Sequence, residues 1–202
     1  MAIEGRKQEI MVLFRTAMEF TERGHHFEVN RVRGLKIEDV NEWEFLYEYV
    51  YVVLNSGMKN QVAEKIFDRW HNSYRDPQVI GHPGKRKAVR EALDKKWEWL
   101  HHIKDELNND SDRLEYIGTL PFMGPITKYH LARNIGLDVA KPDRHLTRLA
   151  GKYGFPGVQE MCRYISERTS ERIGAVDVIL WRYCNMHPKL FSGTGEYPEA
   201  VI

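Results

Sequence analysis

The chain has 202 residues, 42% of them hydrophobic and 11% aromatic, which predicts an ordinary globular protein with one sizeable core or two small lobes. Its 30 Lys and Arg residues balance 29 Asp and Glu residues, so any nucleic-acid surface must be local. Cys162 and Cys184 are too few for a disulfide framework or a four-cysteine iron–sulfur cluster, and no apolar run approaches the ~20 residues that cross a bilayer. We therefore expect a cytoplasmic protein with reduced core thiols.

Apolar residues recur at three- and four-residue spacing along most of the chain, which predicts an all-α protein without strands. The expected helices cover residues 6–22, 43–54, 61–70, 88–107, 111–118, a stretch after residue 125 that Gly136 closes, 158–167 and 172–186. Asp39 or Asn41 would cap the second of these helices, which is apolar nearly all round and should be buried. The tail, residues 188–202, is expected to be extended.

Loops and turns separate these helices. His25 and His26 follow Gly24 in a predicted loop without further ligands at metal-binding spacing, so we expect neither a metal site nor a cofactor. Residues 76–87 read as a connector that ends in a basic run, which would either track a nucleic-acid backbone or be solvated. Asp110 or Ser111 would cap the helix at 111–118. Five residues of the helix at 88–107 are expected to face inward: Leu93, Trp97, Leu100, Ile103 and Leu107.

Residues 120–127 read Leu-Pro-Phe-Met-Gly-Pro-Ile-Thr and predict a tight hairpin between two helices. The first N–H groups of the second helix lack intrahelical partners, so they can hold a phosphate, to which Thr127 and Lys128 would add a hydroxyl and a charge. An ordinary corner between helices explains the same spacing.

Asp143 directly follows Pro142 and precedes the helical pattern of Leu146, Leu149 and Ala150. Aspartate at such a position caps a helix. A carboxylate that caps loosely can also face a substrate and do acid–base or electrostatic work. The sequence pattern leaves both roles open.

Leu120-Pro121-x-Met123-Gly124, followed by a helix and then by Asp143-x-His145-x-x-Arg148, resembles the helix-hairpin-helix DNA glycosylase superfamily, which includes endonuclease III and 8-oxoguanine glycosylase. The resemblance spans roughly residues 40–186. It implies two helical lobes with a cleft between them, one lobe formed by residues 35–140 and the other by residues 1–34 together with 141–202.

The resemblance also implies roles for individual residues. Asp143 would be the essential acid, which stabilises an oxocarbenium-like sugar or activates a nucleophile. The substrate would be a nucleotide flipped out of double-stranded DNA, bound by a monomeric enzyme. The residues expected to contact DNA are Phe122, Met123, Gly124, Ile126, Thr127, Lys128, Asn55, Met58, Lys59, Lys141 and His145. Stacking on the flipped base would fall to Trp43, Tyr47, Tyr51 and Tyr116, although aromatic residues at helical spacing also serve as core.

Three positions depart from the family pattern. Bifunctional members carry a lysine where this chain has Ile126, so no Schiff base and no lyase activity are expected. Phe122 replaces the first glycine of the hairpin, where it would stack or wedge. Gly57 stands where many members insert a glutamine into DNA, which leaves Met58 or Asn55 to fill the gap.

These observations give three hypotheses of function. The first is a monofunctional DNA glycosylase that excises a damaged or modified base. The second is a transferase of glycosylase fold that acts on modified thymines in phage DNA hypermodification. The third is a non-catalytic module that binds DNA through the hairpin alone.

Overall fold

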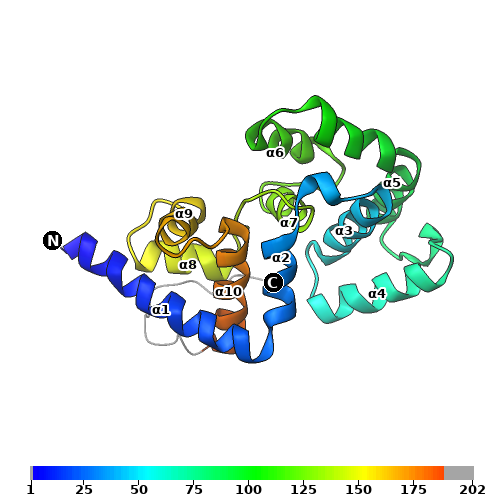
Figure 1. Cartoon of the computed structure of the whole chain (residues 1–202). Helices are drawn as coiled ribbons and strands as arrows, with labels where there is room; N and C mark the ends of the chain where they lie inside the picture. Colours follow the sequence, from blue (N-terminus) through cyan, green and yellow to red (C-terminus); the bar gives the residue numbers. More distant parts are fainter. Residues whose placement is uncertain (1, 189–202) are drawn as a thin grey trace. The chain divides into compact units, whose positions relative to one another are not determined.

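The computed structural model describes residues 2–188, and within that range the protein is all-helical, as the sequence predicted, without a strand (Figure 1). The expected extended tail lies outside the described residues, apart from Pro188. The α-helices are α1 (Ala2–Gly24), α2 (His26–Gly34), α3 (Glu42–Asn55), α4 (Asn60–Asn72), α5 (Pro83–His101), α6 (Asp110–Thr119), α7 (Thr127–Asn134), α8 (Arg144–Lys152), α9 (Val158–Thr169) and α10 (Ile173–Met186). Two 3-10 turns (Ile37–Asp39 and Pro77–Val79) and a π-helical turn after α5 (His102–Glu106) complete the description.

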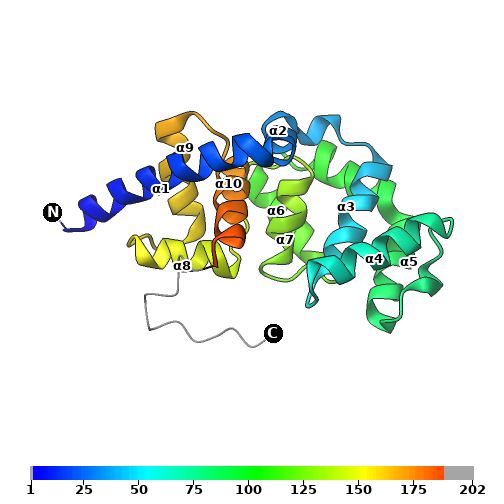
Figure 2. The same ribbon diagram turned by 90° about the horizontal axis from the view of Figure 1, so that it is seen from below.

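The chain divides into two compact units. Unit 1 combines both ends of the chain, up to Leu35 and from Asp138 onward, and contains α1, α2 and α8 to α10. Unit 2 is the continuous stretch Lys36–Leu137 and contains α3 to α7 (Figure 2).

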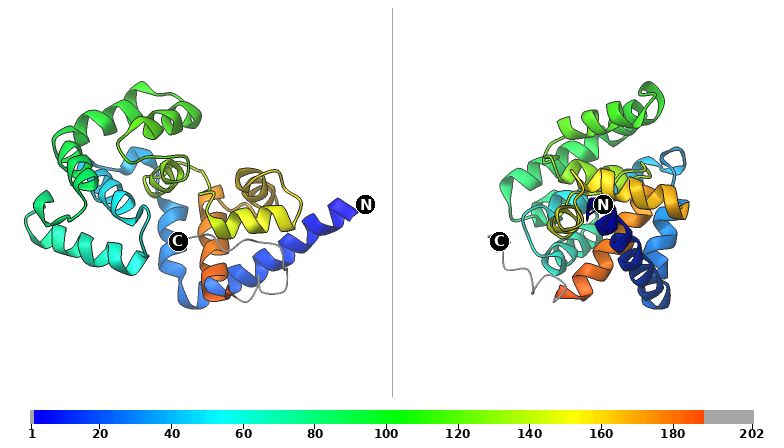
Figure 3. Two further views of the ribbon diagram at one scale, coloured as in Figure 1. Left: turned by 180° about the vertical axis from the view of Figure 1, so that it is seen from behind. Right: turned by 90° about the vertical axis from the view of Figure 1, so that its left-hand side faces the viewer.

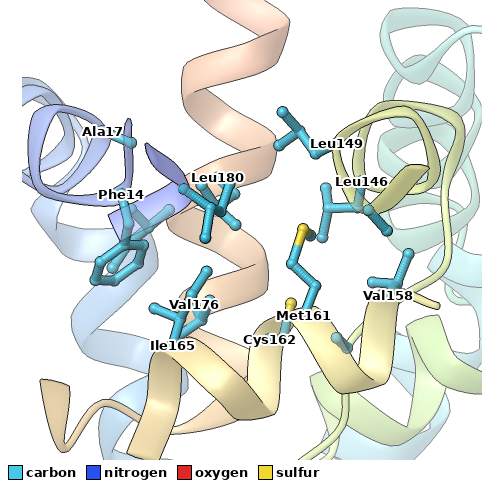
Figure 4. Close-up of a cluster of buried hydrophobic side chains, with 14 of the residues drawn as sticks. Phe14, Ala17, Leu146, Leu149, Val158, Met161, Cys162, Ile165, Val176 and Leu180 are labelled. Atoms are coloured by element: carbon cyan, nitrogen blue, oxygen red, sulfur yellow. The ribbon is translucent and has the colours of Figure 1, made fainter. Parts of the chain in front are cut away.

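Unit 1 is built around α10, which packs against α1, α2, α8 and α9 (Figure 3). Every residue of α10 from Gly174 to Leu180 is buried, as expected of a helix with neighbours on all sides. The core around it draws Phe14 from α1, Leu146 and Leu149 from α8, and Met161 and Ile165 from α9 (Figure 4). Cys162 and Cys184 belong to this core as buried thiols outside any disulfide.

Unit 2 is built around α3, which packs against α4, α5 and α7. Its start is fixed by a capping box, in which the Asn41 side chain accepts the N–H groups of Trp43 and Glu44 while Glu44 accepts the N–H of Asn41. Of the two caps expected from the sequence, the structure uses Asn41. The prediction that this helix is buried is confirmed, because most of its apolar residues are inaccessible to solvent.

Two sequence-based boundaries were wrong. His26 begins the short helix α2 instead of lying in a loop, and this helix is held to α10 by the ion pair between Glu28 and Arg182. The predicted connector 76–87 ends early, because α5 begins at Pro83, with proline at the first helical position and the His82 side chain as its cap. The basic run is therefore helical.

Two sequence-based placements were also wrong. Trp97 was expected to face inward, but it is 66% exposed and its ring stacks on that of His101. The cap of α6 is Asn109, one residue earlier than expected, because its side chain accepts the N–H of Asp112. Neither difference changes which helices form.

No helix in residues 2–188 is long and apolar enough to cross a membrane. In the same stretch, no three His, Cys, Asp or Glu side chains are grouped as metal ligands would be.

Gly136 closes α7 with a φ of +98°, and a Cβ atom there would lie 2.6 Å from the backbone nitrogen of Ile37. We predict that Gly136→Ala lowers the free energy of unfolding by about 2 to 4 kcal/mol, measured by urea denaturation, because both the conformation and the contact exclude a side chain. Gly34→Ala, whose Cβ meets nothing within 4 Å, should stay within about 1 kcal/mol of wild type. Equal effects of the two substitutions would contradict this account.

Candidate functional site

Asp143 ends an irregular segment, residues 138–143, that is tied to helices α9 and α10 of its own unit. The Asp138 carboxylate accepts the N–H of Gly174 at 3.0 Å, at the start of α10. The Gln159 side chain pairs with both backbone groups of Ala140, accepting its N–H and donating to its carbonyl. The segment is therefore tied to two helices before it reaches Asp143, to α10 through its own Asp138 side chain and to α9 through the Gln159 side chain.

A third tie comes from Asp177, in the middle of α10. Its carboxylate accepts the N–H of Lys141 at 2.6 Å and is 1% exposed. A buried carboxylate is tolerated only when it is hydrogen-bonded or paired. The sequence-based prediction assigned Asp177 no role, although a single acid inside an apolar helix was a usable signal. It is a positioning group for the turn that carries Asp143.

Asp143 itself caps α8. Its Oδ1 atom accepts the N–H groups of His145 at 2.9 Å and Leu146 at 3.0 Å. Because both bonds go to Oδ1, the cap does not require Oδ2. The Asp143 side chain is half-buried and lies at the N-terminal end of α8. The helix cap therefore occupies Oδ1.

Two titratable neighbours respond to this setting. Burial lowers the pKa of His145, with the charges of Arg144 and Arg148 acting in the same direction and Asp143 opposing them. Burial, followed by the Asp143 charge, raises the pKa of the Cys184 thiol to about 12. Cys184 is therefore protonated at neutral pH and is unsuited to act as a nucleophile.

The hairpin between α6 and α7 is fixed by hydrogen bonds within unit 2. The Thr127 hydroxyl accepts the Gly124 N–H at 2.7 Å and donates to the Phe122 carbonyl at 3.0 Å. Tyr49 of α3 donates its hydroxyl to the Pro121 carbonyl at 2.7 Å. The Gly124 N–H is consequently engaged by Thr127, while the first N–H groups of α7 follow the turn without a side-chain cap.

Phe122 adopts a φ of +64°, a conformation that favours glycine. Its ring packs edge-on against His82, and its Cζ atom would lie 3.0 Å from a Cβ at Gly84. The side chain is 38% exposed. Phe122 thus rests on the first turn of α5, where the absence of a side chain at Gly84 makes room for the ring.

The position at which the sequence resemblance expects the lysine of bifunctional glycosylases holds an apolar residue. Ile126 directly precedes α7 and is exposed. The side chain of Lys128 runs along Gly118 of α6, and its amine lies 5.5 Å from the centre of the Tyr129 ring. Lys128 is therefore directed along neighbouring helices of unit 2.

The loop between α3 and α4 turns at Gly57, whose φ is +70°. The Asn55 side chain is engaged here, donating to Asn60 at 2.5 Å, and the Tyr51 hydroxyl donates to the same Asn60 oxygen at 2.6 Å. Met58 is half-buried and Lys59 is exposed. The Asn55 side chain, one of those predicted to reach DNA, is therefore already bonded to the first residue of α4.

The four aromatic residues predicted to hold a base lie in two places of unit 2. Tyr47 and Tyr51 both pack against Phe67 of α4, and Trp43 adjoins Tyr47 with ring centres 6.5 Å apart. Tyr116 instead packs against His102, with ring centres 4.2 Å apart. Burial raises the pKa of Tyr51 and of Tyr116, so both phenols are neutral at physiological pH.

Comparison with solved structures identifies the fold. The chain is similar to the Methanocaldococcus jannaschii 8-oxoguanine glycosylase/lyase, solved in complex with a 15mer DNA containing 8-oxoguanine, with a TM-score of 0.65 over 91% of this chain and 98% of that one. The two proteins share the helical glycosylase fold. Their sequences are 17% identical, so the match shows a shared fold and nothing more. No family model and no curated protein matches the sequence.

The lowered pKa of His145 predicts a pH dependence of stability. Between its folded pKa and the ordinary value of 6.5, the unfolded chain binds more protons, so the free energy of unfolding falls as pH falls through that range. We predict that His145→Gln makes this decline shallower in urea denaturation between about pH 5 and 7. His26→Gln controls for the loss of a histidine elsewhere. An unchanged slope in His145→Gln would contradict the prediction.

Proposed function

We propose that this protein is a monofunctional DNA glycosylase, which flips a damaged or modified base out of double-stranded DNA and breaks its N-glycosidic bond. The observation that carries the proposal is the placement of Asp143, which caps α8 through one oxygen at the end of the segment 138–143. The chain also has the fold of a glycosylase that was solved with DNA containing 8-oxoguanine. We further propose that it acts as a monomer in the cytoplasm, without a cofactor.

In this proposal Asp143 supplies the negative charge. As the base leaves, positive charge develops on the sugar, and a fixed carboxylate stabilises it without having to reorganise. The same carboxylate can accept a proton from the attacking water. The ties from Asp138, Gln159 and Asp177 support this role, because a site loses much of its effect when its groups are loosely held.

The hairpin would hold the DNA backbone. The first N–H groups of α7 can bind a phosphate, and Lys128 adds a nearby charge. Thr127 engages the Gly124 N–H, and the Lys128 N–H donates to the Gly124 carbonyl at 3.1 Å. Since Pro125 has no N–H, the phosphate would rely on the N–H groups of Ile126 and Thr127. From the other loop, exposed Lys59 would contact the backbone and Met58 would enter the gap in the duplex. Lys141 and His145 would contact the DNA strand beside Asp143.

Asp143→Asn tests the catalytic role without disturbing the cap, because asparagine caps helices as well as aspartate does. We expect helicity and DNA binding to be retained and base release to fall at least about 100-fold. The assay is single-turnover release from duplexes that each carry one modified base, beginning with 8-oxoguanine. Asp76→Asn, at another capping aspartate, should release base at the wild-type rate.

The two outcomes of that assay separate the hypotheses. Release by Asp143→Asn at the wild-type rate would overturn the assignment of the acid. Tight DNA binding with no release from any duplex, even by wild type, would favour the non-catalytic module, which the capping role of Asp143 also permits.

Ile126 at the lyase position predicts that no covalent intermediate forms. Borohydride reduction during turnover traps a Schiff base between a lysine and the sugar, so we expect no trapped protein–DNA adduct. The M. jannaschii glycosylase/lyase serves as the positive control under the same conditions. A trapped adduct that disappears in Lys128→Ala would show that Lys128 substitutes for the missing lysine.

A further inference from the structure

Lys85, in the first turn of α5, is a buried cation. It is 4% exposed, and its amine donates to the carbonyls of Leu54 at 2.8 Å and Ser56 at 2.6 Å. Both acceptors lie where α3 ends and the loop to α4 begins. The sequence placed Lys85 in a basic connector that would be solvated or would track a nucleic-acid backbone, whereas the structure directs its charge into the protein.

This contact completes the end of α3. The last carbonyls of a helix have no partners within it, and a positive charge at that end is favourable. Lys85 supplies both the donors and the charge from a different helix. Burial lowers the pKa of Lys85, because removal from water disfavours the charged amine. The two hydrogen bonds to carbonyl groups offset this loss of hydration. An apolar side chain of the same length would leave both carbonyls without these donors.

The same turn of α5 also supports the hairpin. Gly84 receives the ring of Phe122, and His82 both contacts that ring and accepts the Lys85 N–H at 3.2 Å. Residues 82–85 therefore touch the α3–α4 loop on one side, through Lys85, and the hairpin on the other, through Gly84. Two of the segments proposed to contact DNA are therefore attached to one point of unit 2.

We infer that Lys85 is a positioning residue that presets the α3–α4 loop for insertion into a DNA duplex, and that the first turn of α5 holds this loop and the hairpin as one binding surface. The inference rests on the proposed function. Lys85 acts through the loop without touching DNA. The hairpin grips phosphates whatever the base sequence, whereas the loop must fill the gap that a flipped base leaves. Loss of Lys85 should therefore weaken the preference for a duplex with a gap more than it weakens the affinity for DNA in general.

The test compares Lys85→Met with Val89→Ala. Methionine keeps the length of the side chain but removes the charge and the donors. Val89 is fully buried one turn further along α5, so its truncation destabilises the same helix without removing the two carbonyl bonds. Lys85→Arg, which retains the charge, provides the conservative variant.

The readout is the ratio of affinities for two duplexes, measured by fluorescence anisotropy. One duplex carries a tetrahydrofuran abasic-site analogue, which presents a gap, and the other is unmodified. We expect wild type to bind the gapped duplex more tightly than the unmodified one. In Lys85→Met this ratio of affinities should fall about tenfold, while the affinity for the unmodified duplex stays within about twofold of wild type. Val89→Ala should keep the preference, and Lys85→Arg should restore part of it.

Hydrogen exchange of the DNA-free protein gives a second readout. Lys85→Met should speed exchange at Gly57 to Lys59 more than Val89→Ala does at matched stability. The inference would be overturned by equal exchange in the two variants, by an unchanged preference in Lys85→Met, or by the same loss of preference in Val89→Ala. None of these results would contradict the proposed function. A wild-type protein without any preference for the gapped duplex would count against the proposed function itself.

Discussion

The hydrogen bond from the Lys141 N–H to the Asp177 carboxylate sets the geometry of the candidate acid site. Asp177 lies inside α10, the helix around which unit 1 is assembled, so its position is fixed by packing on every side. From there it holds the backbone two residues before Asp143. The Asp143 cap then starts α8, whose Leu146 and Leu149 return to the same core. Core packing, the turn and the acid are thus parts of one arrangement, in which a buried charge is stabilised by the backbone that it positions.

In unit 2 a buried side chain again fixes an irregular segment, and here it is a lysine instead of an aspartate. Lys85 reaches across from α5 to the end of α3, and Tyr49 reaches from α3 to the hairpin. In both units a buried or half-buried polar side chain on a regular helix fixes an irregular segment that carries candidate functional groups. Such support leaves little freedom in the segment, which favours recognition and catalysis because less order has to be imposed when a substrate binds.

The hairpin departs from the pattern of the glycosylase family that its sequence resembles, and its departures fit together. A phenylalanine in a left-handed conformation costs about 1 kcal/mol or more relative to glycine, and here its ring gains contacts with His82 and the space above Gly84. Thr127 closes the turn from within, and Ile126 presents an exposed apolar side chain just before α7. The outcome is a hairpin that packs against α5, in a protein that shares its fold with a solved glycosylase/lyase.

The sequence by itself determined the all-α class and the approximate extent of most helices, because apolar spacing is a local property of the chain. It also singled out Asp143 and the hairpin, since turn and capping residues act on their immediate neighbours. It missed α2, a short helix held in part by an ion pair to α10, and the exposure of Trp97. Only the tertiary structure decided the roles of Asp177 and Lys85, whose backbone partners lie 36 and 31 residues away. No local pattern encodes such contacts, because a buried charge finds its partner only when the helices have packed.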